Sequence, residues 1–207
     1  MAAALTRWRR SRDARRQTGL IGPNAILQLL PVLEQAGGVR FRDQVMAMAG
    51  VFAPPSAAGM MPEGPAARMH QALRTLEPEM APSLAWEAGV RTAHYIMAHR
   101  IPQPAQKVLK ALPPMLAAPL LSKAIAKHAW TFAGSGRFMR EGALAFAIAD
   151  NPIVRGEVSA VPLCHWHRAV FETLFRTLAD PRLRCQETHC CAVGHDACRF
   201  TLARAAV

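Results

Sequence analysis

The last quarter of the chain concentrates the side chains that bind transition metals in proteins. All five cysteines lie between Cys164 and Cys198. The same stretch holds further donors, namely Glu187, His165, His167, His189 and His195. Zinc takes thiolate, imidazole and carboxylate ligands, and a structural site completes a tetrahedron with four of them. Gly194, between Cys190 and Cys198, permits a tight bend that would bring two thiols to one point. This spacing predicts a metal site.

The chemistry of these thiols leaves alternatives open. Cys164 is expected in the first turn of a helix, where the positive end of the helix dipole lowers the pKa of a thiol and favours the metal-binding thiolate. Cys185 would share a strand face with Glu187, and Cys191 follows Cys190, so spacing does not fix the fourth ligand. The competing interpretation is a set of ordinary buried thiols or one redox pair, because cysteine is common in cores. The odd number of cysteines disfavours a disulfide framework.

Helical periodicity dominates the first two thirds of the chain. After a candidate N-cap at Asn24, apolar residues recur at spacings of three and four until Gly37-Gly38, with a kink expected at Pro31. Further helices are expected from about residue 41, over 65–76 and 86–100, over 121–132, and over 162–178. Alternation predicts strands over 144–148, 183–187 and 199–202. Helices first and strands late favour an α+β fold.

Charge is distributed unevenly along the chain. The 25 Lys and Arg outweigh the 14 Asp and Glu, and the opening residues include a run of arginines: Arg7, Arg9, Arg10, Arg12, Arg15 and Arg16. Residues 1–20 are therefore expected to form a basic flexible tail, and residues 21–207 a single α+β ligand-binding domain. The tail would allow peripheral contact with an anionic membrane surface. No recognition helix supports a nucleic-acid partner. The apolar runs 111–121 and 143–149 are too short to span a bilayer, and no export signal is expected, so we expect a cytoplasmic protein.

Four of the candidate ligands stand in a register typical of a known family. Pro162-Leu-Cys-His-Trp-His-Arg168 is followed by Glu187-Thr188, Cys190, Gly194, Cys198 and Phe200. Cys164, Glu187, Cys190 and Cys198 are separated in turn by twenty-three, three and eight positions. This signature, over residues 162–202, resembles that of the 4-vinyl reductase domain family. The segments 21–26 and 130–138 resemble the branch of that family found in bacteriochlorophyll synthesis.

The resemblance implies a metal, a fold and an assembly. In related phenol-sensing regulators the signature implies one zinc ion held by three cysteines and one glutamate, which here are Cys164, Cys190, Cys198 and Glu187. Four protein ligands leave no open position, which is typical of structural zinc. The implied fold is a twisted antiparallel sheet flanked by helices, similar to that of haem-based gas sensors and small Golgi-trafficking subunits. The family is often dimeric, so a homodimer is expected.

The family name implies reduction of a vinyl group, which requires an electron source such as a nicotinamide or a flavin. Gly134-Ser-Gly136 is the nearest segment to a dinucleotide motif, but Met139 stands where a third small residue is needed, so a turn is favoured. We therefore expect no catalytic residue and a carrier role. The protein would bind a protochlorophyllide-like magnesium-tetrapyrrole and present it to the enzymes of bacteriochlorophyll synthesis. The alternatives are a vinyl reductase acting on divinyl protochlorophyllide and a small-molecule sensor.

A tetrapyrrole needs a large apolar cleft, and its magnesium ion readily takes an axial imidazole. The axial candidates are His94, His99 and His128. Trp130 and Phe132 are expected to line the cleft, and Arg91 to face a propionate. Further candidates are Trp86, Met97, Met115, Phe138, Arg100, Lys107 and Lys123. The simpler interpretation of each is a core or surface position, because aromatic residues at helical spacing usually pack in cores and single charges usually face water.

Overall fold

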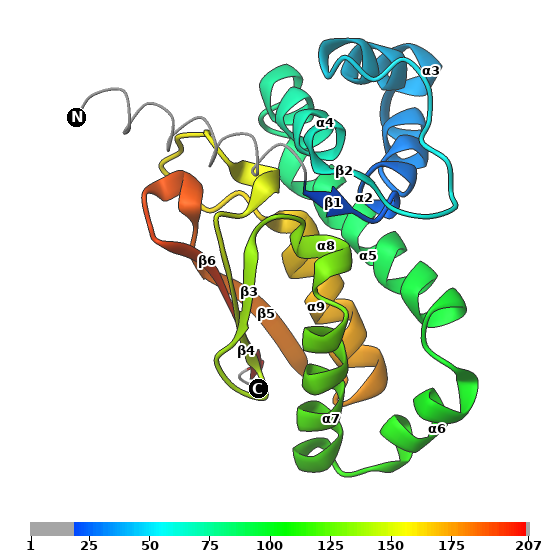
Figure 1. Cartoon of the computed structure of the whole chain (residues 1–207), viewed down its shortest axis with the longest axis vertical. Coiled ribbons are helices and arrows are strands. Elements are labelled where there is room, and N and C mark those ends of the chain that lie inside the picture. Colours follow the sequence, from blue (N-terminus) through cyan, green and yellow to red (C-terminus); the bar gives the residue numbers. More distant parts are fainter. Residues whose placement is uncertain (1–18, 206–207) are drawn as a thin grey trace, which may run out of the picture.

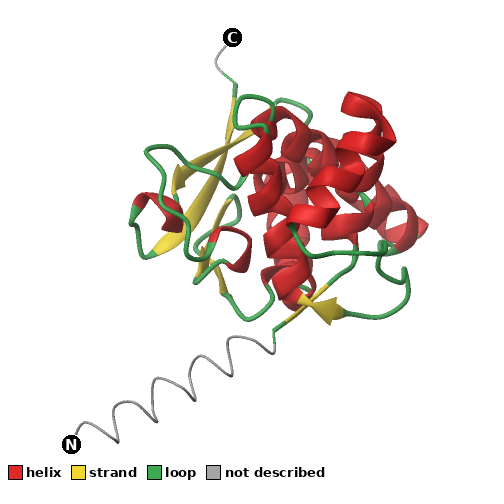
Figure 2. Ribbon diagram, turned by 90° about the horizontal axis from the view of Figure 1, so that it is seen from above, coloured by secondary structure: helices red, strands yellow, loops and turns green. Residues whose placement is uncertain are grey.

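The computed structural model describes residues 19–205, in which helices cover one face of a four-stranded antiparallel sheet (Figure 1, Figure 2). The helices are α2 (Asn24–Leu27), α3 (Leu30–Met48), α4 (Glu63–Leu76), α5 (Ala81–His99), α6 (Gln103–Ala111), α7 (Pro114–Lys127), α8 (Trp130–Ala133) and α9 (His165–Leu178). The sheet contains β3 (Arg137–Arg140), β4 (Ala145–Ala149), β5 (Leu183–His189) and β6 (Ala197–Arg204). Two short strands, β1 (Leu20–Ile21) and β2 (Met61–Pro62), pair separately. The α+β fold predicted from the sequence is confirmed.

The sheet has the order β3-β4-β6-β5, so the last strand in the chain lies between two earlier ones. Along β5 the buried side chains alternate, and Leu183, Cys185 and Glu187 face the helices. The register between β5 and β6 shifts between Glu187 and His189, which marks an irregularity just before the cysteine-rich loop. The loop therefore leaves the sheet at a defined position beside the start of β6.

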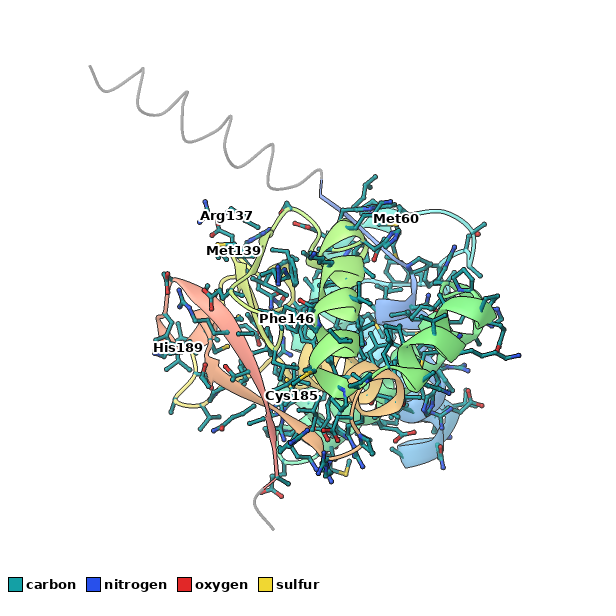
Figure 3. All side chains as sticks on the ribbon, turned by 90° about the horizontal axis from the view of Figure 1, so that it is seen from below. Met60, Arg137, Met139, Phe146, Cys185 and His189 are labelled. Atoms are coloured by element: carbon teal, nitrogen blue, oxygen red, sulfur yellow. The ribbon has the colours of Figure 1, made fainter. Side chains whose placement is uncertain are left out.

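The core is centred on α9, which packs between the sheet and α5. The ring of Phe171 lies 5.1 Å from that of Phe146 and 5.2 Å from that of Phe200, centroid to centroid. Figure 3 shows Phe146 on the face of the sheet that the helices cover. On the other side of α9, a Cβ atom at Gly89 of α5 would lie only 2.4 Å from the carbonyl oxygen of Trp166. The missing side chain lets the two helices approach closely.

Two expectations about the first helices are corrected and one is confirmed. Asn24 is the first residue of α2 and not an N-cap, and α2 ends at Leu27. Pro31 stands in the first turn of α3, where a missing N–H is tolerated, so it begins a helix instead of kinking one. The expected helix end at Gly37-Gly38 is confirmed, because both residues have non-helical backbone angles and Gly38 has a φ of 74°. Residues 39–48, which share the label α3, form the second helix expected from about residue 41.

The middle of the chain contains elements that the sequence pattern did not resolve. The helix expected over 121–132 is divided between α7 and α8, with the break at His128 and Ala129. Pro119 lies within α7 without ending it. The strand β3 was not predicted, because its sequence Arg-Phe-Met-Arg is too short to show alternation clearly.

Most of the expected tail, residues 1–18, lies outside the described residues, while Leu20 pairs with Pro62 between β1 and β2. Within residues 19–205, no helix combines the length and the apolarity that a membrane span requires.

Candidate metal centre and adjoining cavity

The fold brings the four residues of the family signature to one point. Cys164 precedes α9, Glu187 stands near the end of β5, Cys190 follows that strand, and Cys198 lies in β6. One potential ligand atom from each residue lies within 4.8 Å of the others, and all four residues are buried. The centre therefore joins the start of the central helix to two neighbouring strands.

The distances between the three sulfur atoms fit a tetrahedral metal site. The Sγ atom of Cys164 lies 3.3 Å from that of Cys198 and 4.0 Å from that of Cys190, and the Cys190 and Cys198 sulfurs are 3.9 Å apart. Ligands about 2.3 Å from a zinc ion at tetrahedral angles are separated by about 3.8 Å. The donor set and its dimensions could hold a zinc ion.

The carboxylate of Glu187 is held with one oxygen unsatisfied. Its Oε2 atom accepts a hydrogen bond of 2.8 Å from the backbone N–H of Cys164. Its Oε1 atom is buried and has no hydrogen-bond partner. A buried oxygen without a partner is costly unless a cation or a donor satisfies it. A metal ion held by the three neighbouring thiols would satisfy this oxygen.

Without a cation, burial opposes ionisation at this centre. Burial raises the pKa of Cys164 well above its usual value, so in the protein without metal burial outweighs the lowering expected from the helix dipole. Burial also raises the pKa of Glu187 to about 8, with a further contribution from the neighbouring Cys190. Hydrogen bonds from the thiols of Cys164 and Cys198 lower the pKa of Cys190. A bound divalent cation would favour the charged form of every ligand.

Neighbouring N–H groups support two of the sulfurs. The side-chain amide of Asn151, which is fully buried, donates to the Sγ atom of Cys164 over 3.3 Å. The backbone N–H of Cys191 donates to the Sγ atom of Cys198, also over 3.3 Å. Such contacts orient metal ligands and stabilise thiolates. Asn151 was not singled out by the sequence analysis, because a lone Asn before Pro152 indicates only a turn.

The remaining cysteines and histidines stay outside this group of four. Cys185 is buried on the same strand face as Glu187 but lies two residues further from the loop, and its N–H donates to Glu172. The thiol of Cys191 lies 3.9 Å from the carbonyl oxygen of Ile148. The rings of His189 and His195 contact each other at 4.7 Å. Figure 3 shows His189 at the outer edge of the sheet.

A cavity of about 440 Å³ lies beside α9. Side chains of α5, α7, α8 and α9 and the loop before α2 form its walls. Most of its lining is apolar, and it includes Ile96, Leu121, Ile125, Val170 and Phe171. A mostly apolar cavity with a few polar groups is the usual form of a site for a small organic molecule.

The structure separates the expected cavity residues into two groups. His128, Trp130, Phe132 and Arg100 line the cavity. His94, His99 and Arg91 do not: His94 is exposed, the ring of His99 packs against that of Tyr95 with centroids 4.5 Å apart, and Arg91 pairs with Glu87 on the surface. Nor do the further candidates Trp86, Met97, Met115, Phe138, Lys107 and Lys123 belong to the lining. Helical spacing identified α5 and the region of α7 and α8 but not α9, and it does not determine which face of each helix borders a cavity.

Trp166 and His167 line the cavity but were not predicted to do so, because their helix also carries the metal-ligand signature. Trp166 donates from Nε1 to the hydroxyl of Thr92 over 3.1 Å, and both side chains line the cavity. The Nε2 atom of His167 lies 3.3 Å from the carbonyl oxygen of Phe132, while its buried Nδ1 atom has no partner. The spacing of Trp166, Val170 and Leu174 on α9 was the available signal.

Comparisons with known proteins agree with the signature. The model of the 4-vinyl reductase (V-4-R) domain family matches residues 144–204, which span β4, α9, β5 and β6. The chain is 54% identical over 184 residues to the bacteriochlorophyll synthase 23 kDa chain of Cereibacter sphaeroides, covering 88% of this chain and 89% of the relative. It is 48% identical to the protein of the same name from Rhodobacter capsulatus, covering 88% of this chain and 86% of that relative. The chain belongs to the family of the bacteriochlorophyll synthase 23 kDa chain. The 4-vinyl reductase domain resemblance seen in the sequence is thereby confirmed.

The fold of this chain is similar to that of solved H-NOX structures. A mutant H-NOX protein from K. algicida in the unliganded Fe(II) form superposes with a TM-score of 0.57 at 10% identity, covering 90% of this chain and 97% of that one. A second H-NOX structure, from work on heme distortion, gives a TM-score of 0.54 at 7% identity, covering 89% and 95%. These similarities confirm the predicted similarity to gas-sensor folds. At such low identity they bear on the fold alone.

Proposed function

We propose that the protein binds a magnesium-tetrapyrrole intermediate of bacteriochlorophyll synthesis in the cavity beside α9 and presents it to enzymes of that pathway. The observation that carries the proposal is the cavity itself, whose volume of about 440 Å³ falls in the range typical of small-molecule sites. The name of the close relatives, bacteriochlorophyll synthase 23 kDa chain, supports the pathway. A homodimer, as the sequence resemblance implies, is part of the proposal.

The lining offers groups that suit each part of such a ligand. Trp130, Phe132 and Trp166 provide aromatic surface for a planar macrocycle. Arg100 lies at the cavity and would attract a propionate. We assign the axial position on magnesium to His128, whose exposed side chain lines the cavity, and we keep His167 as the second candidate, because its Nδ1 atom has no hydrogen-bond partner but is buried.

The metal centre has a structural role in this proposal. Four protein ligands would close the coordination of a zinc ion and leave no position for substrate or water. The ion would hold Cys164, at the start of α9, against Cys190 and Cys198 beside the sheet. Because α9 also forms one wall of the cavity, the centre would fix the position of that wall.

Spectral titration tests binding and separates it from reduction. The purified full chain is mixed with divinyl and with monovinyl protochlorophyllide, with and without NADPH. We expect a saturable shift of the pigment spectrum and no conversion of the divinyl form. Steady formation of the monovinyl product by the protein alone would replace the carrier role with a reductase. A spectrum unchanged at saturating protein would reject tetrapyrrole binding.

A further inference from the structure

The end of the molecule formed by α6 and α7 exposes several large apolar side chains. Met115 is 79% exposed, Val108 57%, Leu116 52% and Leu120 48%. Figure 1 shows α6 and α7 at the end of the molecule opposite α3 and α4. Single exposed apolar residues are normal on protein surfaces, but four within two consecutive helices indicate an interaction surface.

The exposed face of α7 has a regular composition. Leu116, Leu120, Lys123 and Lys127 are all exposed and recur at spacings of four, three and four residues, so they form one stripe along the helix. The stripe is apolar towards the start of the helix and cationic towards its end. The opposite face of the same helix, with Leu121 and Ile125, is buried against the cavity.

The cations of this surface differ from those elsewhere in the protein. Every lysine of the chain lies in α6 or α7, at Lys107, Lys110, Lys123 and Lys127, and all four are exposed. Between Ile101 and Arg140 the sequence contains no Asp or Glu. Among residues 19–205, the ion pairs of the structure involve arginines and none involves a lysine. The lysines therefore present uncompensated positive charge.

We propose that the α6–α7 surface docks the protein on an anionic lipid bilayer. Apolar side chains flanked by several lysines suit the boundary between acyl chains and negatively charged headgroups. The long lysine side chains can place their ammonium groups among the headgroups while Met115, Leu116 and Leu120 insert between them. This surface is separate from the arginine-rich segment at the N-terminus, and docking there does not require the proposed pigment to be bound.

The docking surface adjoins the cavity. Leu121 and Ile125 line the cavity from the opposite face of α7, while the exposed residues His128 and Trp130 line it just beyond the end of the helix. A docked protein would therefore hold the rim of its cavity close to the lipid. If the proposed function is correct, an apolar pigment could pass between membrane and cavity without crossing water.

Amine footprinting on vesicles tests the surface directly, because the lysines lie nowhere else in the chain. The full-length protein is treated with an acetylating reagent in buffer, with phosphatidylcholine vesicles, and with vesicles that also contain phosphatidylglycerol. Mass spectrometry then measures the acetylation of each lysine. We expect co-sedimentation with the anionic vesicles and protection of Lys123 and Lys127 on them alone. Binding to anionic vesicles with all four lysines still fully reactive would overturn the proposal and assign the contact to another segment.

Two double variants test whether vesicle binding depends on the α6–α7 surface itself and not on the net charge or the exposed apolar area of the whole protein. Lys123→Gln with Lys127→Gln should weaken partitioning onto anionic vesicles by at least about tenfold, and Met115→Ser with Leu116→Ser should also weaken it. The matched controls are Arg40→Gln with Arg137→Gln for charge and Val158→Ser for exposed apolar area, since these side chains are exposed elsewhere. Equal partitioning of the lysine variant and its control, or no vesicle binding by the unmodified protein, would refute the proposal. The second result would leave an acidic protein surface as the partner to examine. Pigment titration in detergent-free buffer, where no membrane is present, reports the proposed function separately.

Discussion

The carboxylate of Glu187 is fixed by the backbone N–H of Cys164 at 2.8 Å, and its other oxygen lies buried without a partner beside three thiols. The contact joins residues twenty-three positions apart in the sequence. One oxygen accepts the N–H at the start of α9, and the other would be available to ligate a cation. In the proposed metal centre the same side chain would serve both the helix and the metal.

Replacing Glu187 by Gln should separate these two roles. The amide oxygen of Glu187→Gln can still accept the hydrogen bond from Cys164, but the NH2 group then left beside the thiols is a donor that does not ligate a cation. We expect a folded protein whose zinc affinity is lower by at least about tenfold. Competition with a chromophoric chelator measures the affinity. Gln186→Glu, on the exposed face of the same strand, is the matched control and should leave the affinity unchanged.

Loss of a sulfur ligand should cost much of the stability of the fold. Cys198 is fully buried, and in Cys198→Ser the hydroxyl is a poor substitute for a thiolate on zinc. We expect the free energy of unfolding to fall by about 3 kcal/mol or more. Cys191→Ser, one of the cysteines outside the centre, should cost far less. If thermal unfolding of the two variants were alike, the thiols would be ordinary core residues.

A buried histidine outside the candidate metal centre makes stability depend on pH. Burial lowers the pKa of His70 to about 3, with a smaller contribution from Arg74, and its Nε2 atom lies 3.1 Å from the carbonyl oxygen of Ala25. The unfolded chain, with a histidine pKa near 6.5, binds the proton more readily than the folded one. Stability from this group is therefore complete above about pH 6.5 and is lost as the pH falls towards 3.

Comparison of His70→Gln with the unmodified protein isolates this effect from acid release of metal. Between pH 6.5 and 4.5 the unmodified protein should lose about 1 to 3 kcal/mol more than the variant. Denaturant unfolding at several pH values gives both curves. Parallel curves would show that His70 does not resist protonation.

The close approach of α5 and α9 should be sensitive to a single methyl group. In Gly89→Ala the new Cβ would meet the Trp166 carbonyl oxygen at 2.4 Å and the Ala169 Cβ at 2.6 Å, so the helices must move apart. We expect a loss of about 1 to 3 kcal/mol in unfolding free energy, together with weaker pigment binding. Gly142→Ala, where the nearest atom is 3.8 Å away, should change neither quantity. Equal stabilities would mean that α9 is not held against α5 as described.

Pigment binding should distinguish histidines that line the cavity from those that do not. His128→Ala should change the spectrum of a bound magnesium-tetrapyrrole and weaken its binding by about tenfold, and His167→Leu tests the second candidate. His94→Ala and His99→Ala are the controls, because neither side chain lines the cavity. A titration in which the control variants lost binding and the lining variants did not would place the pigment elsewhere.

The grouping of thiols with a carboxylate could be predicted from the sequence because these donors are concentrated in the last quarter of the chain. Gly194 in the intervening loop has the φ of 98° that the expected bend needs. Spacing left the fourth ligand open, and the family resemblance supplied the set of four. The strand pattern predicted that Cys185 and Glu187 share one face, which is buried in the structure. That Cys185 lies outside the group of four could not be predicted. Cys185 and Glu187 share one face of β5, and Cys185 lies further from the cysteine-rich loop.

The cavity could be predicted only in part because its lining depends on how helices pack. Periodicity identified α5 and the region of α7 and α8, yet His94 and His99 lie on faces that helix packing leaves outside the cavity. Trp166 and His167 were assigned to the metal region, although α9 serves the centre at its start and the cavity along its length. Two predictions from proline positions were wrong. Pro31 stands in the first turn of α3 instead of kinking a helix, and Pro119 lies within α7 instead of interrupting it.

Elemental analysis joined to zinc X-ray absorption on the full-length protein, purified under reducing conditions, tests the central claim most directly. The predicted result is one zinc ion per chain, coordinated by three sulfur atoms at about 2.3 Å and one oxygen atom at about 2.0 to 2.2 Å. A protein that is folded and free of metal, or a zinc ion whose shell contains nitrogen in place of the Glu187 oxygen, would contradict it.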